Sequence, residues 1–82
     1  MGYHKAKIKK GKIGELSKVQ EELDEAFDAE AQGVKLMLLL ELSDVYLAIK
    51  RYLDKNFPGT TMKDLRKMAK RTESAFKSGK RK

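Results

Sequence analysis

The chain has 82 residues, 40% of them hydrophobic, with no cysteine and no tryptophan. This length supports one small domain that is marginal alone, so oligomerisation is expected, and the lack of cysteine excludes disulfides, cysteine zinc sites and thiol chemistry. Apolar runs such as Leu36 to Leu40 are far shorter than the roughly 20 residues of a membrane span, so we expect a soluble, cytoplasmic protein without membrane partners.

The net charge of +7 is unevenly distributed along the chain. Residues 1–14 carry five lysines and no acid, residues 15–44 carry nine acids and two lysines, and residues 45–82 carry twelve bases and three acids. A basic chain can bind nucleic acid through phosphate contacts, but the acidic middle would repel a phosphate backbone. The same distribution fits a metal-binding centre flanked by basic residues that hold a small polyphosphate.

Within the basic N-terminal segment (1–14), Met1 to Lys12 is expected to be a short helix or a mobile arm. From Glu15 to about Glu30, apolar residues recur in steps of three and four, which predicts an amphipathic helix; they are Leu16, Val19, Leu23, Ala26 and Phe27. Gln32-Gly33 is the expected break, with Gly33 as a C-terminal cap.

A second helix is expected from about Val34 to Lys55, apolar around most of its circumference. Such a helix must be surrounded by partners, and one amphipathic helix cannot cover it, so a homodimer or a homotetramer is predicted. Pro58 and Gly59 indicate a turn, and Thr60 or Thr61 followed by Asp64 predicts the start of a third helix, ending near Phe76. Its expected buried stripe comprises Met62, Leu65, Met68, Ala69, Thr72 and Phe76.

The predicted fold is therefore an all-α helical bundle, with two long antiparallel core helices per chain completed by oligomerisation. Residues 1–77 form the single helical domain, and residues 78–82 are expected to be a basic, disordered tail.

Acidic residues interrupt the apolar pattern of the second helix. At 100° per residue, Glu41 and Asp44 share a face with Met37, Ala48 and Tyr52, whereas the polar strip of this helix lies on the opposite side. Burying unpaired carboxylates costs several kcal/mol each, so two of them one turn apart call for a cation.

The first helix offers a matching pair, Glu22 and Glu25, three residues apart. Antiparallel packing of the two helices would bring all four carboxylates together, and oxygen ligands alone suit Mg²⁺, or Mn²⁺, better than zinc. The only histidine, His4, is distant in sequence, which argues against a ferritin-like di-iron site. For the first helix considered alone, an acid-rich solvated face is the alternative.

These residues resemble the MazG-like, all-α nucleoside triphosphate pyrophosphohydrolases, with the small phage-encoded members closest. The family pattern E-E-x-x-E followed by E-x-x-D reads here as Glu21-Glu22-Leu23-Asp24-Glu25 and Glu41-Leu42-Ser43-Asp44, separated by 15 residues. The resemblance covers roughly residues 11–55; the chain is short for the family, and nothing after Pro58 matches a base pocket.

The resemblance implies Mg²⁺-dependent hydrolysis of a nucleoside triphosphate to the monophosphate and pyrophosphate, in the host cytoplasm if the protein is phage-encoded. Its metal ligands would be Glu22, Glu25, Glu41 and Asp44, with Glu21 as an outer group or the catalytic base and Lys18 near the phosphates.

From helix geometry, Arg51 and Lys55 are further candidates for substrate binding. They lie on the Asp44 side of the second helix, about 10 and 16 Å along its axis from Asp44, which is the length scale of a triphosphate. The alternative function is a non-catalytic basic helical module that binds nucleic acid or a partner protein through its termini.

Overall fold

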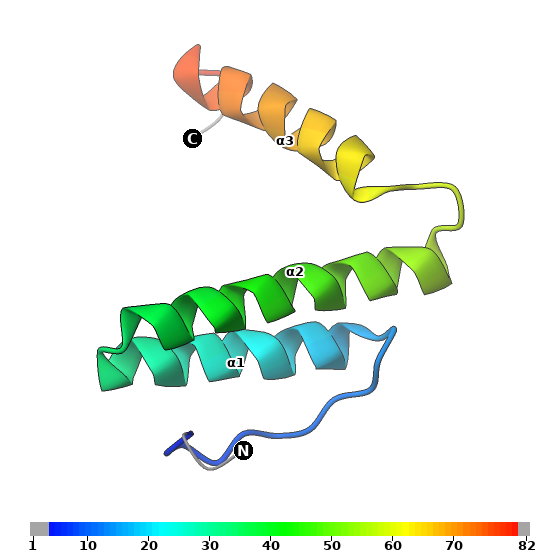
Figure 1. The fold of residues 1–82 in the computed structure, drawn as a ribbon. Coiled ribbons are helices and arrows are strands. Elements are labelled where there is room, and N and C mark those ends of the chain that lie inside the picture. Colours follow the sequence, from blue (N-terminus) through cyan, green and yellow to red (C-terminus); the bar gives the residue numbers. More distant parts are fainter. Residues whose placement is uncertain (1–3, 81–82) are drawn as a thin grey trace.

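A computed structural model describes residues 4–80 of the chain. It contains three helices, α1 (Leu16–Gln32), α2 (Lys35–Asn56) and α3 (Met62–Lys77), and no strand within those residues, so the expected all-α class is confirmed (Figure 1). None of these helices combines the length and the apolar character needed to traverse a bilayer.

Helices α1 and α2 form a tight hairpin and lie side by side, running in opposite directions (Figure 1). The break falls where the sequence predicts it: Gly33 adopts the left-handed conformation at φ 77°, and its N–H donates to the carbonyl of Glu30. A side chain at this position would be strained, so glycine ends α1 and lets the chain reverse within two residues.

The seam between α1 and α2 is built from small residues. Ala26, Ala29 and Ala48 are buried there, together with Leu53 towards the end of α2. Alanines let the two helices approach closely, and the side chains that flank them are therefore enclosed between the helices. Those flanking side chains are largely carboxylates, so the hairpin encloses an acidic layer.

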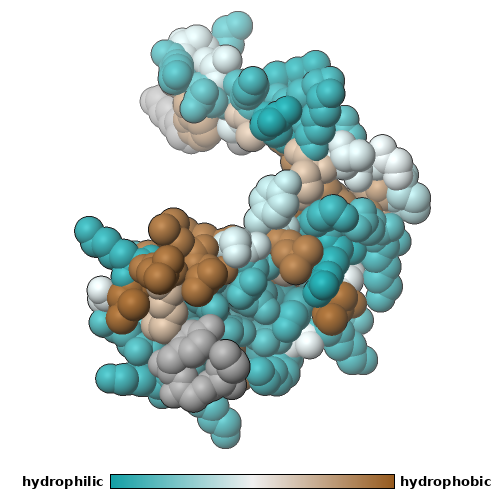
Figure 2. Space-filling model, in the orientation of Figure 1, coloured by the Kyte–Doolittle hydropathy of each residue, from teal (hydrophilic) through white to brown (hydrophobic). Residues whose placement is uncertain are grey.

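The large apolar side chains of α1 point away from this seam. Leu16 and Phe27 are 61% and 62% exposed, and Leu23 is also exposed, whereas Ala26 is buried. The apolar stripe of α1 is wider than the alanine seam, so only the edge of the stripe that carries Val19 and Ala26 contacts α2. Figure 2 shows apolar surface gathered over the end of the hairpin where α1 meets α2.

Helix α3 begins at the predicted capping box. The Thr61 N–H donates to Asp64 Oδ2 over 2.8 Å, and the Asp64 N–H donates to Thr61 Oγ1 over 3.3 Å. After the loop, α3 turns back over the α2 side of the hairpin and diverges from it (Figure 1), and none of its residues is buried. The expected buried stripe of α3 is thus wrong for this single chain: Met68 is 59% exposed, because neither α1 nor α2 reaches it.

The N-terminal segment is neither a helix nor a free arm where the structure describes it. Residues 4–13, which we call the strap, run back along the hairpin in extended form (Figure 1). At the other terminus, residues 78–80 form a turn that is hydrogen-bonded to the end of α3. The remainder of the expected tail, residues 81–82, and residues 1–3 lie outside the described part.

Candidate metal centre

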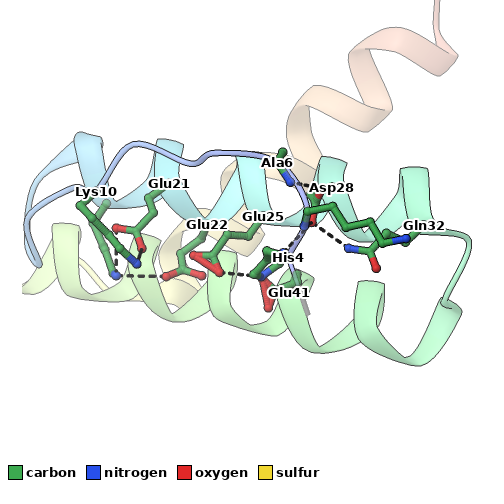
Figure 3. A network of polar contacts seen from close by, with 11 residues as sticks. His4, Ala6, Lys10, Glu21, Glu22, Glu25, Asp28, Gln32 and Glu41 are labelled. Carbon is green, nitrogen blue, oxygen red and sulfur yellow. Dashed lines mark hydrogen bonds and ion pairs between the residues drawn. The ribbon is translucent and has the colours of Figure 1, made fainter. Parts of the chain in front are cut away.

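The acidic layer of the hairpin draws its side chains from a short stretch of each helix. On α1, Glu21 and Glu22 are buried and Glu25 is half-buried, and on α2, Glu41 is only 1% exposed. These spacings place the side chains one helical turn apart on the faces that meet at the alanine seam. Figure 3 shows the row they form between the two helices.

Both predicted carboxylate pairs contribute to this layer. Ligand atoms of Glu22, Glu41 and Asp44 lie within 4.8 Å of one another, and those of Glu21, Glu22 and Glu25 do the same. Asp44 sits at the exposed rim, while Glu41 is at the buried centre. The antiparallel hairpin therefore brings together the four residues that the sequence singles out as metal ligands.

Crowding raises the proton affinity of two acids of the layer, Glu25 and Asp44. Burial, together with the charges of Glu22 and Glu41, raises the pKa of Glu25 to about 7. Burial and the charge of Glu41 also raise the pKa of Asp44. In the chain without a bound cation, part of the repulsion within the layer is thus relieved by holding protons, and a cation would relieve it in their place.

Lys18 and Glu21 form the border of the layer nearest the start of α1. The Lys18 Nζ lies 3.2 Å from Oε1 of Glu21 and 3.2 Å from Oε1 of Glu22. Glu21 also accepts a 2.8 Å hydrogen bond from the Gly11 N–H of the strap. Burial disfavours its charged form, but this hydrogen bond and Lys18 outweigh burial and lower the pKa of Glu21.

A carboxylate with a lowered pKa is a weak base, so these contacts suit Glu21 better to positioning than to proton abstraction. Lys18 provides a positive charge beside the carboxylates, where the resemblance implies a lysine.

The strap brings to the layer a residue that sequence reasoning set aside. His4 Nε2 lies 3.0 Å from Glu25 Oε2 and 3.3 Å from Glu41 Oε2, and His4 Nδ1 lies 2.8 Å from Asp28 Oδ2 (Figure 3). The expectation that histidine is absent from the carboxylate cluster is therefore wrong. Burial opposes the charged imidazolium, but the hydrogen bond to Asp28 and the charges of Glu41 and Glu25 raise the pKa of His4.

Asp28 is the other residue that sequence reasoning missed, and it anchors the strap. Its carboxylate accepts hydrogen bonds from the N–H groups of Lys5 and Ala6 and from the Gln32 side chain. Hydrogen bonds to His4, Ala6 and Lys5 lower the pKa of Asp28 despite burial. A sequence signal existed, since Glu21, Glu25, Asp28 and Gln32 follow a four-three-four spacing that marks one helix face.

The two predicted phosphate ligands on α2 lie apart from this layer. Arg51 is exposed, and Lys55 lies near the loop before α1, where its Cδ would be 2.7 Å from a side chain on Gly14. In the part of the chain that the structure describes, no ion pair links either residue to the carboxylates. Their expected role therefore depends on a bound substrate extending along α2.

Comparison of this chain with protein-family models, curated protein sequences and solved structures finds no match.

Proposed function

We propose that this protein is a Mg²⁺-dependent hydrolase that converts a nucleoside triphosphate to the nucleoside monophosphate and pyrophosphate. The observation that carries the proposal is the meeting of two carboxylate pairs, one from each helix of the hairpin, within an otherwise alanine-lined seam. An arrangement that encloses several carboxylates lowers stability unless a cation neutralises them, so selection for function accounts for it better than selection for folding does.

The donor set fits Mg²⁺. Glu22, Glu41 and Asp44 offer carboxylate oxygens within 4.8 Å of one another, and an ion with ligands at about 2.1 Å separates opposite ligands by about 4.2 Å. Glu25 completes the set from α1, and Mn²⁺ would accept the same oxygens. When bound, the ion would supply neutralisation of phosphate charge and an activated water.

The side chains around the proposed metal site would bind the phosphates and hold one another in position. In the proposed reaction, water adds to the α-phosphorus, the bond to the β-phosphate oxygen breaks, and pyrophosphate leaves. Lys18 would contact the phosphate oxygens from α1, and Glu21 would hold Lys18 and the strap in place. Arg51 and Lys55 would bind the distal phosphates along α2, where both side chains are accessible.

A homo-oligomer is part of the proposal, because the single chain exposes more surface than a compact monomer of its mass, and large apolar side chains are among what it exposes. The chain exposes 6601 Å², whereas a compact 9.4 kDa monomer exposes about 5,000 Å². The excess is roughly twice the ~800 Å² that each partner buries in an interface of standard size. Exposed side chains of α2, among them Leu36, Leu39 and Leu40, would form the centre of a homodimer, or of a homotetramer.

The test is a product assay with each common nucleoside triphosphate, in Mg²⁺ and in EDTA. We expect monophosphate and pyrophosphate, lost in EDTA and in Glu41→Gln. The matched control is Asp54→Asn, which removes an exposed carboxylate from the same helix and should retain activity. Nucleoside diphosphate with orthophosphate as products, or no turnover by a folded and Mg²⁺-loaded protein, would contradict the proposal.

One observation favours a second function, binding of nucleic acid or an acidic partner protein. Helix α3 carries six basic residues against two acidic ones, and none of its residues is buried against the hairpin. This function predicts an affinity for nucleic acid that falls steeply with salt and that survives Glu41→Gln. The two functions therefore differ in their response to the same variant. Either one is compatible with a cytoplasmic location, which we include in the proposal.

A further inference from the structure

The strap places an imidazole nitrogen among the carboxylates of the hairpin. His4 Nε2 and one carboxylate oxygen each from Glu25 and Glu41 form a group whose atoms all lie within 4.8 Å of one another. Three segments of the chain contribute to it, namely the strap, α1 and α2. The His4 side chain is 12% exposed and that of Glu25 is 15% exposed, so solvent reaches the edge of the group while Glu41 closes its inner side.

The second ring nitrogen of His4 is held by a residue outside this group. Nδ1 lies 2.8 Å from Asp28 Oδ2, and within residues 4–80 the Asp28 carboxylate also accepts hydrogen bonds from the amides of Lys5, Ala6 and Gln32. A carboxylate surrounded by donors is an acceptor only, so Nδ1 carries a proton towards Asp28. Nε2 is thereby the atom directed at Glu25 and Glu41.

A carboxylate that accepts from one nitrogen of a histidine is a recurrent support for metal-binding histidines. It fixes the ring orientation and makes the other nitrogen a better ligand. The separations are also those of ligands around one ion: Nε2 is 3.0 Å from Glu25 Oε2 and 3.3 Å from Glu41 Oε2. Neighbouring ligands at about 2.1 Å from a shared ion lie about 3.0 Å apart in octahedral geometry and about 3.4 Å apart in tetrahedral geometry.

We propose that His4, Glu25 and Glu41 form a divalent-cation site with one nitrogen and two carboxylate ligands, which binds a first-row transition ion such as Co²⁺ or Mn²⁺ in preference to Mg²⁺. Imidazole nitrogen favours transition ions, whereas Mg²⁺ favours oxygen ligands. The site shares Glu25 and Glu41 with the oxygen-only site of the proposed function and adds a nitrogen ligand to it. It concerns metal binding alone and requires no nucleotide.

Because His4 is the only histidine in the chain, spectroscopy can identify this ligand without ambiguity. Tag-free full-length protein loaded with Mn²⁺ should show the ¹⁴N coupling of an imidazole in pulsed electron paramagnetic resonance, and His4→Gln should lack it. By calorimetry, His4→Gln should bind Co²⁺ about 10-fold or more weakly, with the affinity for Mg²⁺ nearly unchanged. Lys5→Ala, which alters the neighbouring strap residue and keeps its backbone amide, is the matched control and should bind both ions like the original protein.

Absence of ¹⁴N coupling in the original protein would overturn the inference, and this measurement does not require any variant to fold. Equal or tighter binding of both ions by His4→Gln would also overturn it, because His4 would then compete with the cation for the carboxylates. Nucleotide hydrolysis without ¹⁴N coupling would refute this site alone, and ¹⁴N coupling without hydrolysis would refute the proposed function alone.

Discussion

The raised proton affinity of Glu25 makes the stability of the cation-free protein depend on pH in an unusual direction. The native state holds the Glu25 proton up to about pH 7, whereas an unperturbed glutamate releases it near 4.5. Between these values the native state binds more protons than the unfolded state does, so the free energy of unfolding must fall as the pH rises. In most globular proteins the paired carboxylates are already ionised above about pH 5, so their stability changes little over this range.

The size of the effect follows from the shift. Each pH unit inside this window removes at most about 1.4 kcal/mol, so the step from about pH 5 to about pH 6.5 removes up to about 2 kcal/mol. For a domain of this length, each kcal/mol of lost stability lowers Tm by roughly 4–8 °C. His4 acts in the same direction, but only above its ordinary value of 6.5, because its pKa is raised. The interval below pH 6.5 therefore isolates the carboxyls from His4.

The assay is urea unfolding in EDTA at fixed protein concentration, at pH values across this interval. Glu25→Gln keeps the shape of the side chain and removes its titration, so we expect it to lose most of the decline. Glu30→Gln changes an exposed glutamate on the same helix, and its free energy of unfolding should fall with pH as in the original protein. A free energy of unfolding that is flat or rising from pH 5 to 6.5, or an unchanged slope in Glu25→Gln, would refute the reasoning.

Three further predictions concern the strap, α3 and the apolar face. In Gly11→Ala, the added methyl would lie 2.2 Å from the Ser17 carbonyl oxygen, so the strap must shift off α1. We expect the free energy of unfolding to fall by about 1–3 kcal/mol and hydrogen exchange in the strap to become faster. The control variant Lys9→Ala should show neither change. Thr61→Ala should lower the stability of α3 by about 1 kcal/mol and reduce the helical circular dichroism signal. An equal reduction of that signal in Thr60→Ala would refute the assignment of Thr61 as the cap. Leu39→Glu should convert the oligomer to monomers in sedimentation, and unchanged mass would show that this 63%-exposed side chain lies outside any interface; Lys50→Glu is the control.

Much of the local structure follows from the sequence. Apolar periodicity predicts α1 and α2, Gly33 ends α1 as a left-handed cap, and Thr61 with Asp64 begins α3. These features depend on neighbouring residues only, because helix periodicity and caps are set within one or two turns. The grouping of Glu22 and Glu25 with Glu41 and Asp44 was also predictable, because two helices joined by a two-residue turn must pack antiparallel and have few ways to do so.

Tertiary structure decided what the sequence left open. The alanine seam determined that carboxylates, and not Leu16 or Phe27, lie between the helices, because close approach depends on the smallest side chains of both partners. His4 reaches Asp28 across 24 positions of chain, and no local pattern encodes the path of an extended strap. The place of α3 is likewise outside the reach of periodicity: an amphipathic stripe shows that a helix has an apolar face, and only a packing partner determines whether that face is covered.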